Sequence, residues 1–268
     1  MIGGNSMTIE FKTETVQLHV NGRVATVELN RPESLNSLNV EMLKGLAAVL
    51  KEISQSSEVD IVVLRGKGRA FSSGGDIKTM LLEANEEDFP IVMDCISEVV
   101  ATLYTMPKLT ISAVTGAAAG LGLSIALATD YIVADKASKL AMNFIGIGLI
   151  PDGGGHYFLE KRLGEDKAKH LIWEGKPLTA EEAFKLGLVH DVAESLEEVL
   201  EAKLQLLLNS PIQAMIETKT ILAEKNTPQL LRVLELEKEG QHKMRQSQDH
   251  QEGIQAFLEK RRPVFIGK

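Results

Sequence analysis

A single carboxylate, Asp152, stands between an apolar segment and three glycines in the stretch GLIPDGGG (148–155). A run with helical character follows, so one interpretation is an N-cap, in which the Asp152 side chain accepts hydrogen bonds from the first amides of that helix. The other is a proton-transfer group held in a site lined by glycines. The octapeptide alone favours the cap.

Two earlier turns are also rich in glycine. In RAFSSGGDIKTM (69–80), Gly74 and Gly75 follow an apolar strand, and VTGAAAGLGLSIALATD (114–130) leads from a strand into a helix. Adjacent glycines let a backbone amide approach a ligand closely, and the amides at the start of a helix favour negative charge. Taken singly, each turn is more often explained by tight packing between a strand and a helix.

Other chemistries that glycines or histidines could indicate find little support. Residues 120–122 begin a G-x-G-x-x-G pattern, but Ile125 occupies its third glycine position. The Gly-Lys pairs at 66–67 and 175–176 lack the following Ser or Thr of a phosphate-binding loop, and Ser72-Ser73 is not in a G-x-S-x-G elbow. The six histidines have no metal-ligand spacing, so we expect no metal site.

The elements that must position these turns alternate between strands and helices over the first two thirds of the chain. Asn21-Gly22 predicts a two-residue hairpin, and Asn39 predicts the start of a helix with apolar residues at helical spacing. The expected elements are strands at 16–20 and 23–29, a helix from Asn39 to Ile53, a strand at 61–65, a helix near 89–104, a strand at 110–114, a helix to Thr129 and a strand at 131–134.

From about Asp166 onward the pattern is almost entirely helical. Thr179 and Glu182 have the spacing of a capping box, and apolar stripes follow at 194–208, 211–223 and 228–239. So many stripes are unlike those of a free appendage, which indicates an assembly surface. We therefore expect a core at 7–195 and a C-terminal helical oligomerisation region at 196–268.

Composition limits the class of protein. The chain has 268 residues, 44% of them hydrophobic and 25% charged, as in an ordinary globular protein. Its net charge of -8 argues against a nucleic-acid partner. Cys95 is the single cysteine, so no internal disulfide forms, and neither a signal peptide nor a membrane-spanning run is recognisable. These features favour a cytoplasmic protein with no membrane partner.

The three glycine turns, taken in order with other segments, carry a family resemblance that covers nearly the whole chain after Met7. The chain resembles the enoyl-CoA hydratase/isomerase family, also called the crotonase superfamily. This implies an α/β fold built as a spiral of ββα units, a C-terminal helical trimerisation region, a homotrimer or dimer of trimers, and a coenzyme A thioester as substrate with no further cofactor. The segments are NRPESLNSLN (30–39), RAFSSGGDIK (69–78), AVTGAAAGLGLSIALATDYIVA (113–134), IGIGLIPDGGGHYFLEKRLG (145–164), GKPLTAEEAFKLGLVHDV (175–192) and EGIQAFLEKRRPVF (252–265).

The resemblance also implies roles for individual residues. In relatives, backbone amides at the positions of Gly75 and Leu121 bind the thioester oxygen, and preorganised donors there stabilise the negative charge that develops on it. Segment 73–78 would lie along the pantetheine and adenine, and the cations at 260–261 are candidates for the nucleotide phosphates or simply a solvated helix face. The implied acyl-CoA contacts are Ser34, Ser73, Asp76, Ile77, Lys78, Ser124, Phe144, Lys260 and Arg261.

Departures from the family pattern bear on the reaction. Typical hydratases carry two catalytic glutamates where this chain has Ser124 and Phe144, so ordinary hydration should be slow. Asp152 matches the catalytic aspartate of dienoyl-CoA isomerases and of the phenylacetate-pathway enoyl-CoA isomerases. One carboxylate suffices to move a double bond, and an apolar neighbour such as Phe144 would raise its proton affinity by desolvation. The resemblance thus favours a catalytic Asp152 that also caps the helix.

Two other readings stay open at this point. One is a hydratase, or another reaction of this family, in which Asp152 acts with a bound water. The other is an inactive acyl-CoA-binding subunit, which the missing glutamates favour and the retained Asp152 opposes.

Overall fold

Two β-sheets form the centre of the protein. The computed structural model describes residues 13–78 and 87–268, so the first residues of the expected core and the stretch 79–86 lie outside it. In the larger sheet β1 pairs antiparallel with β2 and all other neighbours are parallel. Its strands, in spatial order, are β1 (Val16–Asn21), β2 (Val24–Leu29), β3 (Ile61–Gly66), β4 (Leu109–Val114), β6 (Tyr131–Asp135) and β9 (Asp191–Ala193).

The second sheet is smaller and lies next to the glycine turns. It contains β5 (Ala117–Ala119), β7 (Lys139–Ala141) and β8 (Leu178–Thr179). Isolated parallel bridges between Ser72 and Ala118 and between Leu38 and Gly75 add backbone pairing at the first glycine turn. The chain therefore passes repeatedly from the large sheet to the small one and then into a helix, as in β4, β5 and α3 (Leu121–Leu127). This confirms the expected α/β spiral of ββα units.

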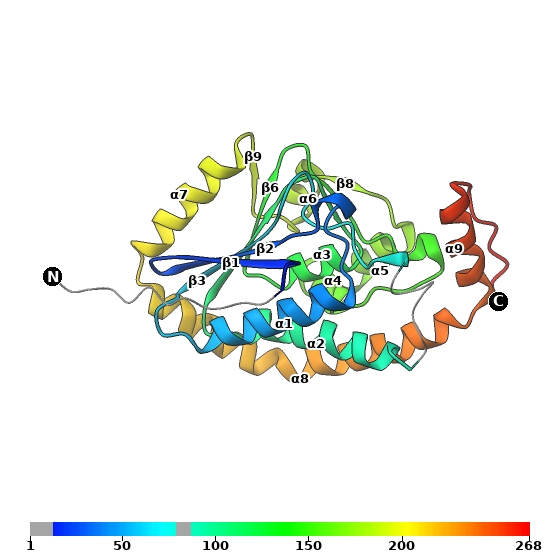
Figure 1. Ribbon diagram of the computed structural model, residues 1–268, viewed down its shortest axis with the longest axis horizontal. Coiled ribbons are helices and arrows are strands. Elements are labelled where there is room, and N and C mark those ends of the chain that lie inside the picture. The colour runs from blue at the N-terminus through cyan, green and yellow to red at the C-terminus, as the bar shows by residue number, and fades with distance from the viewer. Residues whose placement is uncertain (1–12, 79–86) are drawn as a thin grey trace.

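Helices cover the large sheet and extend beyond it. In Figure 1 the long helix α8 runs along the lower edge of the molecule, and α2 packs against both α1 and α8. The helices are α1 (Val40–Gln55), α2 (Phe89–Thr105), α3, α4 (Gly155–Leu163), α5 (Glu165–Glu174), α6 (Ala180–Leu186), α7 (Leu196–Leu208), α8 (Ile212–Arg245) and α9 (Gln248–Glu259), with short 3₁₀ helices η1 (Pro32–Ser34) and η3 (Phe144–Ile147). Within the described ranges, no helix is both long and apolar enough to cross a membrane.

The local sequence patterns correctly predict several element boundaries. Asn39 caps α1, because its side-chain oxygen accepts a hydrogen bond of 2.9 Å from the Met42 amide. Thr179 and Glu182 form the predicted capping box at the start of α6. The predicted hairpin between β1 and β2 is also present, but its turn lies one residue later than expected: Asn21 pairs with Val24, and Gly22-Arg23 form the turn, with Gly22 at a φ of 57°.

Helix α8 differs from the prediction of two separate stripes at 211–223 and 228–239. It is one helix of 34 residues that continues through Pro228. Pro228 has no N–H group to donate to the backbone carbonyl of Glu224, so the helix loses one hydrogen bond there. Both residues lie on the exposed side of the helix. Ala223 and Leu230 are buried on either side of the proline, so packing of the inner face outweighs the local penalty.

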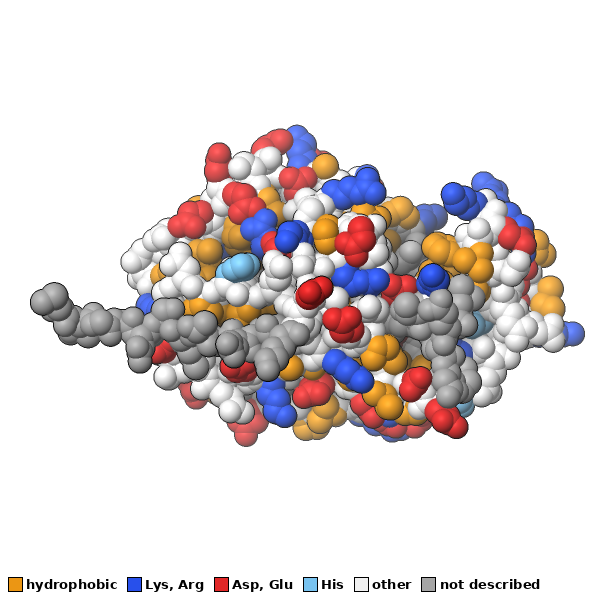
Figure 2. All heavy atoms as spheres, in the orientation of Figure 1, with side chains coloured by type: hydrophobic (Ala, Val, Ile, Leu, Met, Phe, Trp, Pro, Cys, Tyr) orange, Lys and Arg blue, Asp and Glu red, His pale blue; other side chains and the backbone are white. Residues whose placement is uncertain are grey.

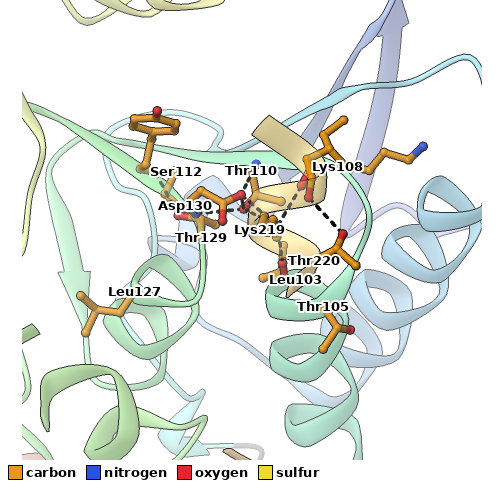
Figure 3. Close-up of polar contacts among 12 residues, drawn as sticks. Leu103, Thr105, Lys108, Thr110, Ser112, Leu127, Thr129, Asp130, Lys219 and Thr220 are labelled. Carbon is orange, nitrogen blue, oxygen red and sulfur yellow. Dashed lines mark hydrogen bonds and ion pairs between the residues drawn. The ribbon is translucent and has the colours of Figure 1, made fainter. Parts of the chain in front are cut away.

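A buried lysine anchors α8 to the rest of the protein. The Lys219 ammonium group forms an ion pair with Asp130 at 2.9 Å and donates a hydrogen bond of 2.8 Å to the Lys108 carbonyl (Figure 3). Asp130 in turn accepts hydrogen bonds of 2.8 Å from the amide and hydroxyl of Thr110 on β4. Burial lowers the pKa of Lys219, and Asp130 opposes that shift. The cluster therefore fixes one half of α8 against β4.

Replacing Lys219 by Met should destabilise the protein by about 2 kcal/mol, because it leaves the partly buried Asp130 without its charged partner. Urea denaturation of wild type and variant measures this difference. A double variant that also carries Asp130→Asn should lose less, since no uncompensated charge remains. A single variant within about 0.5 kcal/mol of wild type would contradict the anchoring role.

Candidate active site

The three glycine turns meet at one cavity of about 290 Å³. The first turn, the start of α3, the segment from η3 to Asp152, the end of α5 and one side chain of α9 enclose it. Its lining residues are Ser73, Gly74, Gly75, Asp76, Ile77, Gly120, Leu121, Asn143, Phe144, Ile145, Gly146, Ile147, Leu149, Asp152, Glu174, Gly175 and Phe257. The residues predicted as catalytic, Asp152, Gly75 and Leu121, thus share one cavity.

Backbone contact between the first two turns explains the need for glycine there. The Ser72 amide donates to the Ala117 carbonyl and the Ala119 amide donates to the Ser72 carbonyl, both at 3.0 Å. Gly74 has a φ of 100°, and a Cβ at this position would lie 2.8 Å from the Ala119 oxygen. Only glycine allows this approach. The contact holds the amides of the first turn beside the start of α3.

Two backbone amides at this junction have no role in the described fold. Leu38 donates to the Gly74 carbonyl at 2.8 Å and accepts from the Asp76 amide at 3.0 Å, so the pairing bypasses the Gly75 N–H. Within residues 13–78 and 87–268 the Gly75 amide has no hydrogen-bond acceptor. Leu121 is the first residue of α3, where an amide has no partner within the helix. Both amides can therefore serve a ligand in the cavity.

The third turn packs directly onto α3. A Cβ at Gly153 would lie 2.7 Å from Leu121 Cδ1, and one at Gly155 would lie 3.0 Å from Ser124 Oγ. Ser124 is fully buried beneath this turn and is not among the lining residues. A longer side chain at 124 would collide with the turn, so the serine allows the close packing that brings Asp152 to the cavity.

Asp152 is a buried carboxyl group with one satisfied oxygen. Its side chain is 8% exposed, and Oδ2 accepts a hydrogen bond of 3.1 Å from Gln241 Nε2 on α8. Oδ1 is buried and has no hydrogen-bond partner among the described residues. Burial, followed by the nearby carboxylate of Glu237, raises the pKa of Asp152 to about 8. The group can therefore exchange a proton near neutral pH.

The expectation that Asp152 caps the following helix is wrong. Helix α4 begins at Gly155, and its N-cap residue Gly154 has a φ of 76° and no side-chain cap. The cap comes from α8 instead, because Glu237 accepts hydrogen bonds from the Gly154 amide at 2.7 Å and from the His156 amide at 3.1 Å. Asp152 lies two residues before the cap position, where its side chain bonds to Gln241 rather than to the helix amides.

Four of the predicted acyl-CoA contacts line the cavity, and three others on the core do not. Ser73, Asp76, Ile77 and Phe144 are lining residues, whereas Ser34, Lys78 and Ser124 are not. Asp76 forms an ion pair with Arg31 at 2.9 Å and accepts a hydrogen bond from the Ser37 hydroxyl at 3.1 Å. These bonds fix the first turn from outside the cavity.

The two cations predicted for the phosphates lie at the end of α9, where Lys and Arg side chains gather in Figure 2. Lys260 is exposed and ends α9 in the left-handed conformation, with a φ of 54°. Arg261 forms ion pairs with Glu252 and Glu259, which neutralise its charge in this arrangement. Neither lines the cavity, although Phe257 of α9 does.

Three polar residues of the candidate site were not predicted from the sequence: Glu237 and Gln241 of α8, and Glu174 of α5, which lines the cavity. Glu237 and Gln241 are 2% and 3% exposed. They continue the buried stripe of Leu230 and Leu234 at spacings of three and four residues. Their spacing relative to the buried leucines was the available signal. A carboxylate and an amide on the buried face of a helix need hydrogen-bond partners there, which indicates a polar site.

The model of the enoyl-CoA hydratase/isomerase family matches residues 19–268. The chain belongs to this family. It is 51% identical over 257 residues to YhaR of Bacillus subtilis (strain 168), which is provisionally named as an enoyl-CoA hydratase/isomerase, with 94% of this chain and 99% of the relative covered.

Two further relatives show the same agreement over nearly the whole chain. The 1,2-epoxyphenylacetyl-CoA isomerase of Escherichia coli (strain K12) is 34% identical over 260 residues, which cover 95% of this chain and 99% of the relative. The crystal structure of an enoyl-CoA hydratase from Mycobacterium avium subsp. paratuberculosis K-10 superposes with a TM-score of 0.85 at 31% identity, covering 94% and 98% of the two chains. The protein is therefore a member of an enzyme family that acts on acyl-CoA substrates.

Proposed function

We propose that the protein is an enoyl-CoA isomerase that moves a C=C double bond, with Asp152 as the proton shuttle. The Asp152 carboxylate removes a proton from the carbon between the thioester and the double bond. The electron pair delocalises over the thioester carbonyl and the double bond to give a dienolate, whose oxygen the Gly75 and Leu121 amides stabilise. Protonated Asp152 then returns the proton to the far end of the conjugated system, which regenerates the carboxylate.

The observation that carries this proposal is the position of one buried carboxyl in the same cavity as two unused amides. Asp152, Gly75 and Leu121 all line the cavity, and Oδ1 of Asp152 has no partner among the described residues. A pKa of about 8 suits a group that must both take and return a proton near neutral pH. The sequence similarity to the E. coli relative named 1,2-epoxyphenylacetyl-CoA isomerase also supports an isomerase.

The deciding experiment is incubation with a panel of 2-enoyl-, 3-enoyl- and dienoyl-CoA thioesters, followed by chromatography and mass spectrometry. Isomerisation changes retention at constant mass, and this is the result we expect. Because the sequence does not reveal the acyl group, the panel should vary in chain length, branching and aromaticity. No change with any thioester would favour an acyl-CoA-binding subunit and overturn the proposal.

A hydratase that uses Asp152 and a bound water is the second candidate. The observation that favours it is Glu174, whose carboxyl group lines the same cavity as Asp152. Two carboxyl groups allow one to activate water while the other handles the proton. Against this role, Glu174 is exposed and forms an ion pair of 3.2 Å with Lys176. Product that gains the mass of one water would establish this candidate in place of the isomerase.

The pH dependence of the reaction follows from the raised pKa of Asp152. Only the deprotonated carboxylate can abstract a proton, so kcat/KM for isomerisation should rise about tenfold per pH unit below about 8 and level off above it. Initial rates at low substrate concentration, measured across the pH range, give this rise of kcat/KM with pH. A rate that is flat from about pH 6 to pH 9 would contradict the assignment of the base.

The proposed assembly is a trimer or a dimer of trimers formed through the C-terminal helical region, 196–268. Exposed leucine and isoleucine side chains on α7 and α8 support it, since a monomer would leave them in water. They are Leu206, Ile221, Leu222, Leu231 and Leu236. Sedimentation velocity at micromolar concentration should give the mass of three or six chains, and a monomer there would contradict the proposal.

A further inference from the structure

Helix α8 reaches the catalytic turn at a point where its surface is unusually close. A Cβ at Gly240 would lie 2.4 Å from Ile150 Cδ1, so glycine at this position permits the approach. On either side of Gly240, Glu237 and Gln241 are one helical turn apart and face the same way. Both are buried against segment 150–156.

Glu237 holds the backbone of the catalytic turn. Its carboxylate accepts hydrogen bonds from the Gly154 amide at 2.7 Å, the His156 amide at 3.1 Å and the His156 ring Nδ1 at 2.8 Å. Three donors thus satisfy a carboxylate that is only 2% exposed. Its negative charge also lies at the N-terminus of α4, where the helix dipole favours it. The turn that carries Asp152 is thus fixed from α8.

Gln241 holds the side chain of Asp152 itself. Its Nε2 group donates to the Ile150 carbonyl at 2.7 Å and to Asp152 Oδ2 at 3.1 Å. The amide orientation is defined, because a backbone carbonyl only accepts hydrogen bonds and so requires the NH₂ group. Oδ2 is therefore engaged, and Oδ1 is the oxygen with no partner in the described part of the chain.

We propose that Glu237 and Gln241 are positioning residues, which fix the Asp152 carboxyl so that Oδ1 exchanges the substrate proton. Glu237 acts through its charge and through the turn, and Gln241 acts through its hydrogen bond to Oδ2. This inference rests on the proposed function for the reaction that Asp152 performs. The geometry of the three residues does not depend on it.

Glu237 and Gln241 also adjust the proton affinity of Asp152 in opposite directions. After burial, the Glu237 carboxylate is the next cause that raises the pKa of Asp152, whereas the hydrogen bond from Gln241 stabilises the anion and lowers it. On α4, the His156 ring faces Glu237 rather than Asp152. Among the described side chains, the two that shift the pKa of Asp152 after burial thus belong to a single helix.

Among the described residues, the other carboxyl groups that line the cavity are paired with cations of their own. Asp76 forms an ion pair with Arg31, and Glu174 forms one with Lys176. Neither pair changes in a substitution on α8. A shift in the titration of Asp152 after such a substitution thus reports on α8 itself.

The experiment titrates Asp152 directly in the full-length protein. With ¹³C label in the aspartate carboxyl groups, the Asp152 resonance is the one that Asp152→Asn removes. Glu237→Gln should lower its titration midpoint by about one pH unit, because a like charge is lost. Gln241→Met should raise the midpoint, because the hydrogen bond to the anion is lost. Glu239→Gln is the matched control, since it makes the same charge change at an exposed position of α8.

A merely structural role would not produce shifts of opposite sign in the two variants. Circular dichroism checks that each variant is folded, and if Glu237→Gln fails to fold, Gln241→Met still tests the direction of the shift. Wild-type midpoints in the folded variants, or a shift of the same sign in both, would overturn the inference. If the shifts occur but no thioester isomerises, the positioning inference holds and the proposed reaction fails.

The kinetic readout completes the test if the reaction is an isomerisation. Gln241→Met should lower kcat by roughly tenfold or more with little change in KM, because it alters how the carboxyl is held rather than how substrate binds. The acid limb of the pH profile should move with the titration midpoint in each variant. An unchanged kcat in folded Gln241→Met would contradict the positioning role.

Discussion

Replacing Asp152 by Asn should leave a folded protein that binds acyl-CoA, while isomerase turnover falls by roughly 10²–10⁴, the usual effect of losing a positioned general base. Asn has nearly the same shape, and its side-chain oxygen can still accept the hydrogen bond from Gln241. The variant cannot carry a proton between two carbons. Steady-state rates and a ligand-binding titration measure the two properties separately.

The cap on α4 does not complicate this result. Glu237 rather than Asp152 provides the cap, so the substitution removes no helix-terminal hydrogen bond. Wild-type activity in Asp152→Asn would therefore rule out the shuttle without any ambiguity from folding. Reaction in deuterated water offers a companion measurement, because a single carboxyl that moves the proton should show some internal return of the substrate hydrogen.

The same variant should show a characteristic dependence of stability on pH. The folded protein holds the Asp152 proton up to a pKa of about 8, whereas the unfolded chain releases it near the ordinary value for aspartate, about 3.9. Wild type thus loses stability from Asp152 as the pH rises between these two values. Asn does not titrate, so the melting temperature of the variant relative to wild type should increase from about pH 5 to about pH 8.

The parts of the fold that the sequence predicted depend on local chemistry. The hairpin that joins β1 to β2, predicted within one residue, the cap at Asn39 and the capping box at Thr179 each involve residues at most three positions apart. The glycine turns were also visible, because close backbone approach leaves few alternatives to glycine. Their meeting at one cavity came from the family resemblance, and no local pattern contains it.

What could not be predicted lies in contacts between distant segments. The cap of α4 comes from Glu237, which is 83 residues after Gly154, and Gln241 is 89 residues after Asp152. A local pattern assigned the cap to the nearest carboxylate and was wrong, because packing of α8 brings a better-placed one. The two apolar stripes at 211–223 and 228–239 likewise belong to one helix, which continues through Pro228 because its inner face is buried.

The second large effect concerns the first glycine turn. Gly75→Pro removes the backbone donor and should lower turnover by about 10²–10³, as expected for the loss of one hydrogen bond to a developing oxyanion. The fold should tolerate it better than most prolines, because the pairing with Leu38 uses the Gly74 carbonyl and the Asp76 amide and bypasses the Gly75 N–H. Rates with the thioester that wild type isomerises, together with circular dichroism, measure both properties.

Gly75→Ala is the matched control for that change, because it keeps the N–H group and adds only a methyl group. If the oxyanion contact is what proline removes, the alanine variant should retain far more activity than the proline variant, and KM should change less than kcat in the latter. If both variants lose turnover equally, the cause is the added bulk in the cavity rather than the loss of the N–H donor. Full activity in a folded Gly75→Pro protein would remove this amide from the mechanism and leave Leu121 as the donor to test.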